Sequence, residues 1–156
     1  MQKIINKIFS QSVFEDRPPI LIDVGASGSV HARFKPLAKA SVCIAFDADD
    51  REMHQVVAKD SKDFKRLYVV NSVLSEKEDT EIPFFLTKYP YCSSTLKPDS
   101  DSLKDWDRSE IFEIEKLSST KATTLRKVLT ELNLSKVDWF KTDSQGTDLR
   151  LFQSLG

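Results

Sequence analysis

The chain has 156 residues, 40% of them hydrophobic and 30% charged, with 23 basic and 24 acidic residues and a net charge of −1. This is the length of one domain, and such a chain buries roughly 68–70% of its unfolded surface. Neither charge sign forms a long block, so we expect no nucleic-acid partner. The apolar runs are too short for an integral membrane segment.

Two cysteines, Cys43 and Cys92, show neither the spacing of a metal site nor a disulfide framework. The first residues lack the apolar core of a secretory signal. We therefore expect a cytoplasmic protein without a metal site.

Residues 1–18 are predicted to form an N-terminal helix and a lead-in to the domain. Ile4, Ile5, Ile8 and Phe9 lie on one face at helical spacing. This pattern predicts a short amphipathic helix that docks on the domain. Binding to a membrane surface is the alternative.

The first half of the remaining domain, residues 19–156, alternates between apolar runs and amphipathic stretches. The predicted strands are 20–24, 41–46 and 66–70, and the predicted helices are 31–40 and 49–59. This order predicts a parallel sheet with right-handed crossovers.

The alternation changes beyond residue 80. Strands are predicted at 81–87, 110–117 and 137–142, and helices at 122–132 and from Thr147 onward. A polar loop at 88–108 contains Tyr89, Tyr91, Ser93 and Ser94. Loops of this length in small domains are usually functional or mobile, and we interpret this one as a lid or a wall of an acceptor site.

The most informative turn follows the first strand, where Asp23 precedes Gly25. A dinucleotide fingerprint would need glycines at 25, 27 and 30, but the sequence has Gly25, Ser27 and Val30. The pattern fits S-adenosylmethionine better, because Asp23 can face its ammonium group and Gly25 permits close backbone approach. An aspartate that caps the next helix is the alternative interpretation.

Acidic and amide side chains also end the next two predicted strands. Asp47 is placed to accept hydrogen bonds from ribose hydroxyls, although Asp49 is close enough to compete and Asp49 or Asp50 can cap a helix. Asn71 and Ser72 end the third strand, where an adenine ring would lie. A loop asparagine that satisfies backbone groups is an equally good explanation.

Five sequence blocks occur in an order that resembles the FkbM-type S-adenosylmethionine-dependent methyltransferases over roughly residues 19–156. They are Asp23-Val24-Gly25-Ala26-Ser27, Phe46-Asp47-Ala48-Asp49, Asn71-Ser72-Val73-Leu74-Ser75, Cys92-Ser93-Ser94-Thr95-Leu96 and Lys141-Thr142-Asp143-Ser144-Gln145-Gly146-Thr147-Asp148.

The resemblance implies an α/β, Rossmann-like class I methyltransferase fold with a doubly wound, mostly parallel sheet. It implies O-methylation of hydroxyls on a sugar or glycan precursor or another small molecule. The cofactor-binding residues would be Asp23, Gly25, Ala26, Ser27, Asp47, Ala48, Asn71 and Ser72. The family's domain continues past the last block, so we expect this chain to be the N-terminal portion of a C-terminally truncated domain.

Asp143 is the predicted catalytic base, because it ends the strand expected beside the first one. Binding the methionine moiety or capping the last helix are its alternative roles. His31 is expected at the rim of the site. The competing functions are a methyltransferase-like binding module without activity and an NAD-dependent oxidoreductase on a similar fold.

Overall fold

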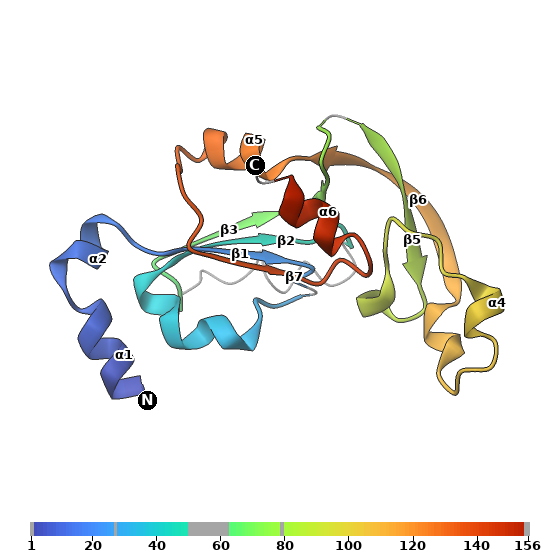
Figure 1. Cartoon of the computed structure of the whole chain (residues 1–156), viewed down its shortest axis with the longest axis horizontal. Coiled ribbons are helices and arrows are strands. Elements are labelled where there is room, and N and C mark those ends of the chain that lie inside the picture. The colour runs from blue at the N-terminus through green and yellow to red at the C-terminus, as the bar shows by residue number, and fades with distance from the viewer. Residues whose placement is uncertain (1, 27, 50–62, 79, 155–156) are drawn as a thin grey trace.

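The computed structural model describes residues 2–26, 28–49, 63–78 and 80–154. A four-stranded parallel sheet with the order β3–β2–β1–β7 lies at its centre (Figure 1). Its strands are β1 (Ile20–Val24), β2 (Val42–Phe46), β3 (Arg66–Val70) and β7 (Trp139–Thr142). The four strands predicted for this sheet are confirmed to within two residues at either end.

Helices cover both faces of this sheet. The helices α5 (Leu125–Glu131) and α6 (Asp148–Gln153) lie on one face and the helical segment η1 (Ala32–Ala40) lies on the other (Figure 1). Successive side chains of a strand point to opposite faces, so Ile22 packs with the α5 and α6 core and Leu21 packs with Phe34 of η1. The central sheet is therefore compatible with a Rossmann-like α/β fold.

The first crossover differs from the prediction. Residues 32–40 form a 3₁₀ helix and not an α-helix. Pro36 lies inside this segment and has no N–H to donate to the preceding turn, which disfavours a regular α-helix. The helix predicted at 49–59 falls, apart from Asp49, outside the described residues.

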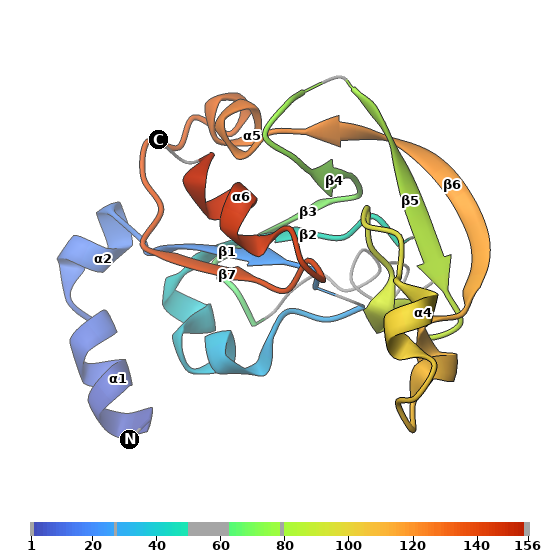
Figure 2. The same ribbon diagram turned by 45° about the vertical axis from the view of Figure 1, so that its right-hand side comes forward.

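A second sheet of three strands adjoins the carboxyl ends of the first (Figure 2). In it β6 (Ile114–Thr123) pairs in parallel with β4 (Val73–Leu74) and antiparallel with β5 (Glu81–Thr87). The prediction of a mostly parallel sheet thus holds for the central sheet alone. The loop between β5 and β6 contains η2 (Pro90–Cys92), α4 (Ser100–Leu103) and η3 (Ser109–Phe112).

Three predicted boundaries in this region are wrong. Residues 109–112 form a 3₁₀ turn, so the strand predicted from Glu110 starts at Ile114. This strand then runs to Thr123, because it pairs with β5 as far as Lys121 and with β4 at Ala122 and Thr123, so α5 starts only at Leu125. Thr124 caps α5 by accepting a hydrogen bond from the N–H of Lys127 at 3.2 Å.

The N-terminal segment forms two helices, α1 (Gln2–Phe9) and α2 (Ser12–Asp16). They pack on each other through Phe9 and Phe14, whose ring centroids lie 4.6 Å apart. Ile4 and Ile8 are 65% and 44% exposed, but Ile5 and Phe9 are half-buried and α1 contacts η1, so the helix docks on the domain as predicted while Ile4 and Ile8 stay exposed. Among the described residues, no helix is long and apolar enough to cross a membrane.

Candidate functional site

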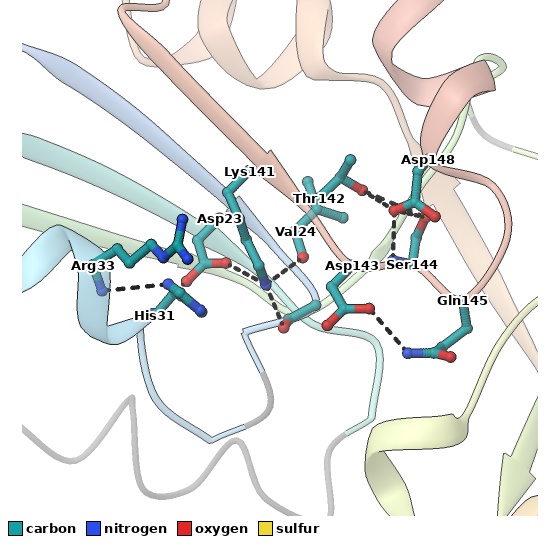
Figure 3. A network of polar contacts seen from close by, with 11 residues as sticks. Asp23, Val24, His31, Arg33, Lys141, Thr142, Asp143, Ser144, Gln145 and Asp148 are labelled. Carbon is teal, nitrogen blue, oxygen red and sulfur yellow. Dashed lines mark hydrogen bonds and ion pairs between the residues drawn. The ribbon is translucent and has the colours of Figure 1, made fainter.

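An ion pair between Asp23 and Lys141 joins the carboxyl ends of β1 and β7 (Figure 3). The two residues are direct partners in the parallel register, so both side chains leave the same face of the sheet. The Nζ atom of Lys141 lies 2.9 Å from Oδ1 of Asp23. It also donates to the carbonyl oxygens of Val24 and Gly25, each at 3.2 Å.

The second carboxylate oxygen of Asp23 also contacts the protein. Oδ2 accepts a hydrogen bond from the backbone N–H of His31 at 2.6 Å, and the Asp23 side chain is 0% exposed. His31 itself is exposed, as expected of a rim residue, and its Nδ1 accepts from the N–H of Arg33 at the start of η1. Direct contact between Asp23 and a ligand stays a prediction.

The turn after β1 depends on Gly25. Its φ of +74° lies in the left-handed region, and a Cβ atom at this position would overlap the backbone carbonyl oxygen of Asp143. The N–H groups of Gly25 and Ala26 donate to the carbonyl of Phe46 at 2.9 and 3.1 Å. We expected this glycine to permit close approach of a ligand, whereas the structure shows that the backbone of Asp143, after the end of β7, approaches it closely.

Asp47 and Asp49 form a tight turn at the end of β2. The backbone N–H of Asp49 donates to Oδ1 of Asp47 at 2.9 Å, and both side chains are buried. The N–H of Asp47 donates to the carbonyl of Val70 at 3.2 Å, which fixes this turn against the end of β3. The Asp47 carboxylate is thus oriented by the backbone N–H of Asp49.

Four of the predicted cofactor-binding residues line one cavity of about 50 Å³ at the carboxyl ends of the strands. They are Gly25, Asp47, Ala48 and Ser72. A second cavity of about 220 Å³ adjoins it and shares Val73, Leu74, Thr95, Thr147 and Leu151 with its lining.

The other predicted residues lie elsewhere. Asp23 and Ala26 are buried, Asn71 is exposed, and Ser27 lies outside the described residues. Asp143 is exposed on the turn that follows β7.

The loop predicted as a lid or wall crosses the first cavity. Ser93, Ser94 and Thr95 contribute to its lining. The hydroxyl of Ser94 lies within hydrogen-bonding distance of the carbonyl oxygens of Ser144 and Gln145, at 3.3 and 3.2 Å. Its backbone pairs with Phe85 of β5. This segment therefore ties the second sheet to the end of β7.

Asp148 organises the turn after β7. Its Oδ1 accepts from the hydroxyl of Thr142 at 2.9 Å and from the N–H and hydroxyl of Ser144 at 2.9 and 3.0 Å (Figure 3). Its Oδ2 accepts from the N–H of Gly146 at 3.2 Å. Burial raises the pKa of this carboxyl, but these hydrogen bonds outweigh burial and hold the pKa below its usual value. Asp148 is thus a structural residue of the turn.

Asp143 points away from Asp148 and accepts a hydrogen bond from the side-chain amide of Gln145 at 3.0 Å (Figure 3). Its carboxylate is near enough to Cys92 of η2 to affect that thiol. Burial raises the pKa of Cys92, and the negative charge of Asp143 raises it further. The loop containing η2 thus lies beside the predicted catalytic residue.

Sequence reasoning missed two kinds of site residue. Ser144 and Thr147 line the first cavity, and Lys141 lies beneath the turn of Gly25. All three residues belong to the sequence block from Lys141 to Asp148, but only the tertiary structure shows which residues they contact. The described residues contain no group of three or more His, Cys, Asp or Glu side chains that could hold a metal ion.

Comparisons with protein-family models, with curated proteins and with solved structures find no match for this chain.

Proposed function

We propose that this chain carries an S-adenosylmethionine-dependent O-methyltransferase site that acts on a hydroxyl group of a sugar or glycan precursor. The observation that supports it best is the convergence of Gly25, Asp47, Ala48 and Ser72 on one cavity. That cavity lies at the carboxyl ends of parallel strands, where open α/β sheets bind nucleotides.

The residues fit an adenosyl ligand without a phosphate. Asp47 brings a buried, oriented carboxylate to the cavity, as a ribose-binding residue requires. Ser72 lines the same cavity at the end of β3, where we place the adenine, with Asn71 beside it. In the sequence Gly25 is followed by Ala26 and Ser27, without the further glycines that a pyrophosphate needs.

When bound, S-adenosylmethionine supplies an electrophilic methyl carbon: the acceptor oxygen bonds to it, the carbon–sulfur bond breaks with its electron pair passing to sulfur, and the hydroxyl proton leaves to a base. Asp143 is the candidate base, because it is exposed at the end of β7 and its carboxylate is oriented by Gln145. The loop with Ser93 and Ser94 would limit access of water to this region.

Calorimetric titration tests the ligand class. We expect S-adenosylhomocysteine to bind and NAD to bind more weakly or not at all. Tighter binding of NAD would favour the oxidoreductase and refute this proposal. We infer a cytoplasmic location, in keeping with two free cysteines of which Cys43 is buried.

A non-enzymatic binding module is the second candidate. It is favoured by the exposed apolar side chains of Trp139, Leu149 and Phe152 on β7 and α6. In the described part of the chain β7 pairs with β1 alone, so its other edge is open to a further strand. Ligand binding without methyl transfer to any hydroxylated acceptor would support this candidate over the enzyme.

A further inference from the structure

Lys141 supplies the cation that is paired with the fully buried Asp23 carboxylate. Its own side chain is 20% exposed, compared with 0% for Asp23. Burying a carboxylate is costly unless it is paired and hydrogen-bonded. The ion pair at 2.9 Å from Lys141 and the hydrogen bond from the His31 N–H together meet this requirement.

Lys141 contacts three oxygen atoms at once. Its Nζ donates hydrogen bonds to the carbonyls of Val24 and Gly25 and forms the ion pair with Asp23. The carbonyl of Val24 also accepts from the N–H of Asp143 at 3.0 Å. Lys141 therefore holds two successive carbonyls, of Val24 and Gly25, and both of these residues line the cavity.

A comparable arrangement at the other end of the same strands provides a reference. There the Asp138 carboxylate accepts from the N–H of Ile20 at 2.8 Å and forms an ion pair with Lys136 at 3.0 Å. Both side chains of that pair are more than a third exposed. There the hydrogen bond of Asp138 links β1 to the segment before β7, and the ion pair with Lys136 lies within that segment. The pair of Lys141 crosses directly between the two strands, is more buried and lies next to the candidate site.

We propose that Lys141 is a positioning residue that fixes the turn of Gly25 for ligand binding, and that Asp23 acts through Lys141 and not by direct contact with the ligand's ammonium group. The part that concerns the ligand rests on the proposed function. The part that concerns the turn depends only on the contacts of Lys141. Asp23 is then needed for affinity because it orients Lys141 and the His31 N–H.

The test compares Lys141→Met with two controls. Lys136→Met removes the exposed pair at the other strand end. Val128→Ala truncates a buried core side chain on the opposite face of the central sheet, away from the turn of Gly25. It is the control for a loss of global stability that does not involve the turn. Affinity for S-adenosylhomocysteine is measured by calorimetry well below the melting temperature of every variant, and amide hydrogen exchange is followed by NMR.

We expect Lys141→Met to weaken S-adenosylhomocysteine binding by about tenfold or more, since one charged hydrogen bond is worth roughly this factor. Lys136→Met and Val128→Ala should bind within about twofold of the wild type. The His31 amide should exchange faster in Lys141→Met than in Val128→Ala when both are compared at equal loss of global stability. Wild-type affinity in a folded Lys141→Met variant would overturn the proposal.

The double variant Asp23→Asn/Lys141→Met separates positioning from stability and covers the case in which Lys141→Met fails to fold. It removes both charges, so it should recover much of the melting temperature lost by Lys141→Met. Because the carbonyls of Val24 and Gly25 still lack the Lys141 donor, affinity should stay low. Full recovery of affinity in the double variant would show that the ion pair of Asp23 and Lys141 stabilises the fold and does not position the turn for ligand binding.

The two proposals fail in different ways. If the wild type binds no S-adenosylhomocysteine, the proposed function is wrong, and the exchange of the His31 amide still tests Lys141. If the wild type binds and the His31 amide is equally protected in Lys141→Met and Val128→Ala, Lys141 is not a positioning residue.

Discussion

A Cβ atom on Gly25 would overlap the backbone carbonyl oxygen of Asp143, so the turn after β1 packs directly against the turn after β7. The N–H of Asp143 also donates to the carbonyl of Val24. The predicted cofactor turn and the predicted catalytic residue are therefore rigidly linked, although 118 positions separate Gly25 from Asp143 (143 − 25).

Gly25→Ala should destabilise the fold. The substitution places a side chain at a φ of +74° and against backbone that cannot rotate away. We expect a loss of about 2–4 kcal/mol in the free energy of unfolding, from left-handed strain and overpacking together. Urea unfolding measures this loss.

Gly146→Ala is the control for that measurement. Gly146 also has a positive φ, of +110°, but its added Cβ would meet the flexible end of Leu96 at 2.9 Å. We expect a smaller loss of stability, because the Leu96 side chain can move. Equal losses of stability in Gly25→Ala and Gly146→Ala would show that the contact with the Asp143 backbone does not determine the cost of the Gly25 substitution.

Asp47→Ala should weaken S-adenosylhomocysteine binding by about ten- to a hundredfold, the value of a lost hydrogen bond to a charged group. Asp47 lines the cavity at the end of β2, whereas Asp49 is buried but does not line it. Asp49→Ala is therefore the matched control, and calorimetry should show a smaller effect. A larger effect of Asp49→Ala would move the ribose assignment to that residue.

Asp143→Asn distinguishes the two roles open to this residue. If Asp143 is the general base, affinity for S-adenosylhomocysteine should be nearly unchanged and kcat should fall by a factor of roughly 10²–10⁴. If it holds the methionine moiety, affinity should fall and kcat at saturation should largely survive. Steady-state kinetics with a hydroxylated acceptor, combined with calorimetry, gives both quantities. Unchanged kcat at saturation excludes the role as a base.

Asp148→Asn should destabilise the protein at neutral pH and have less effect in acid. The pKa of Asp148 is lower in the folded protein, so its stabilising contribution is present above the unfolded pKa and is lost as the pH falls through the folded pKa. We expect a loss of about 1–3 kcal/mol at pH 7 from the weakened hydrogen bonds of the turn.

Urea unfolding of wild type and Asp148→Asn at neutral pH and below pH 3.8, the ordinary pKa of the group, checks this dependence. The control is Asp105→Asn, which changes an exposed carboxylate in the loop between β5 and β6. If the difference in the free energy of unfolding between wild type and Asp148→Asn is the same at neutral and acid pH, the charge of Asp148 does not stabilise the turn.

Local sequence determined the central strands. The apolar runs at 20–24 and 42–46 are so continuous that burial on both faces follows from composition, and the strands found there are buried at every residue. The sequence also placed Asp47 and Ser72 at strand ends, which the parallel sheet brings to one cavity. These predictions succeeded because strand formation and the position of strand ends depend on neighbouring residues.

Tertiary structure alone decided the partners of the polar side chains. Asp23 pairs with Lys141 because β7 lies beside β1 in a particular register, and no local pattern specifies that register. The extent of β6 follows likewise from pairing with β5 and, at Ala122 and Thr123, with β4, which overrides the helical pattern there. Strand pairing and ion pairs join residues far apart in the chain, so their geometry is fixed only when the whole sheet has formed.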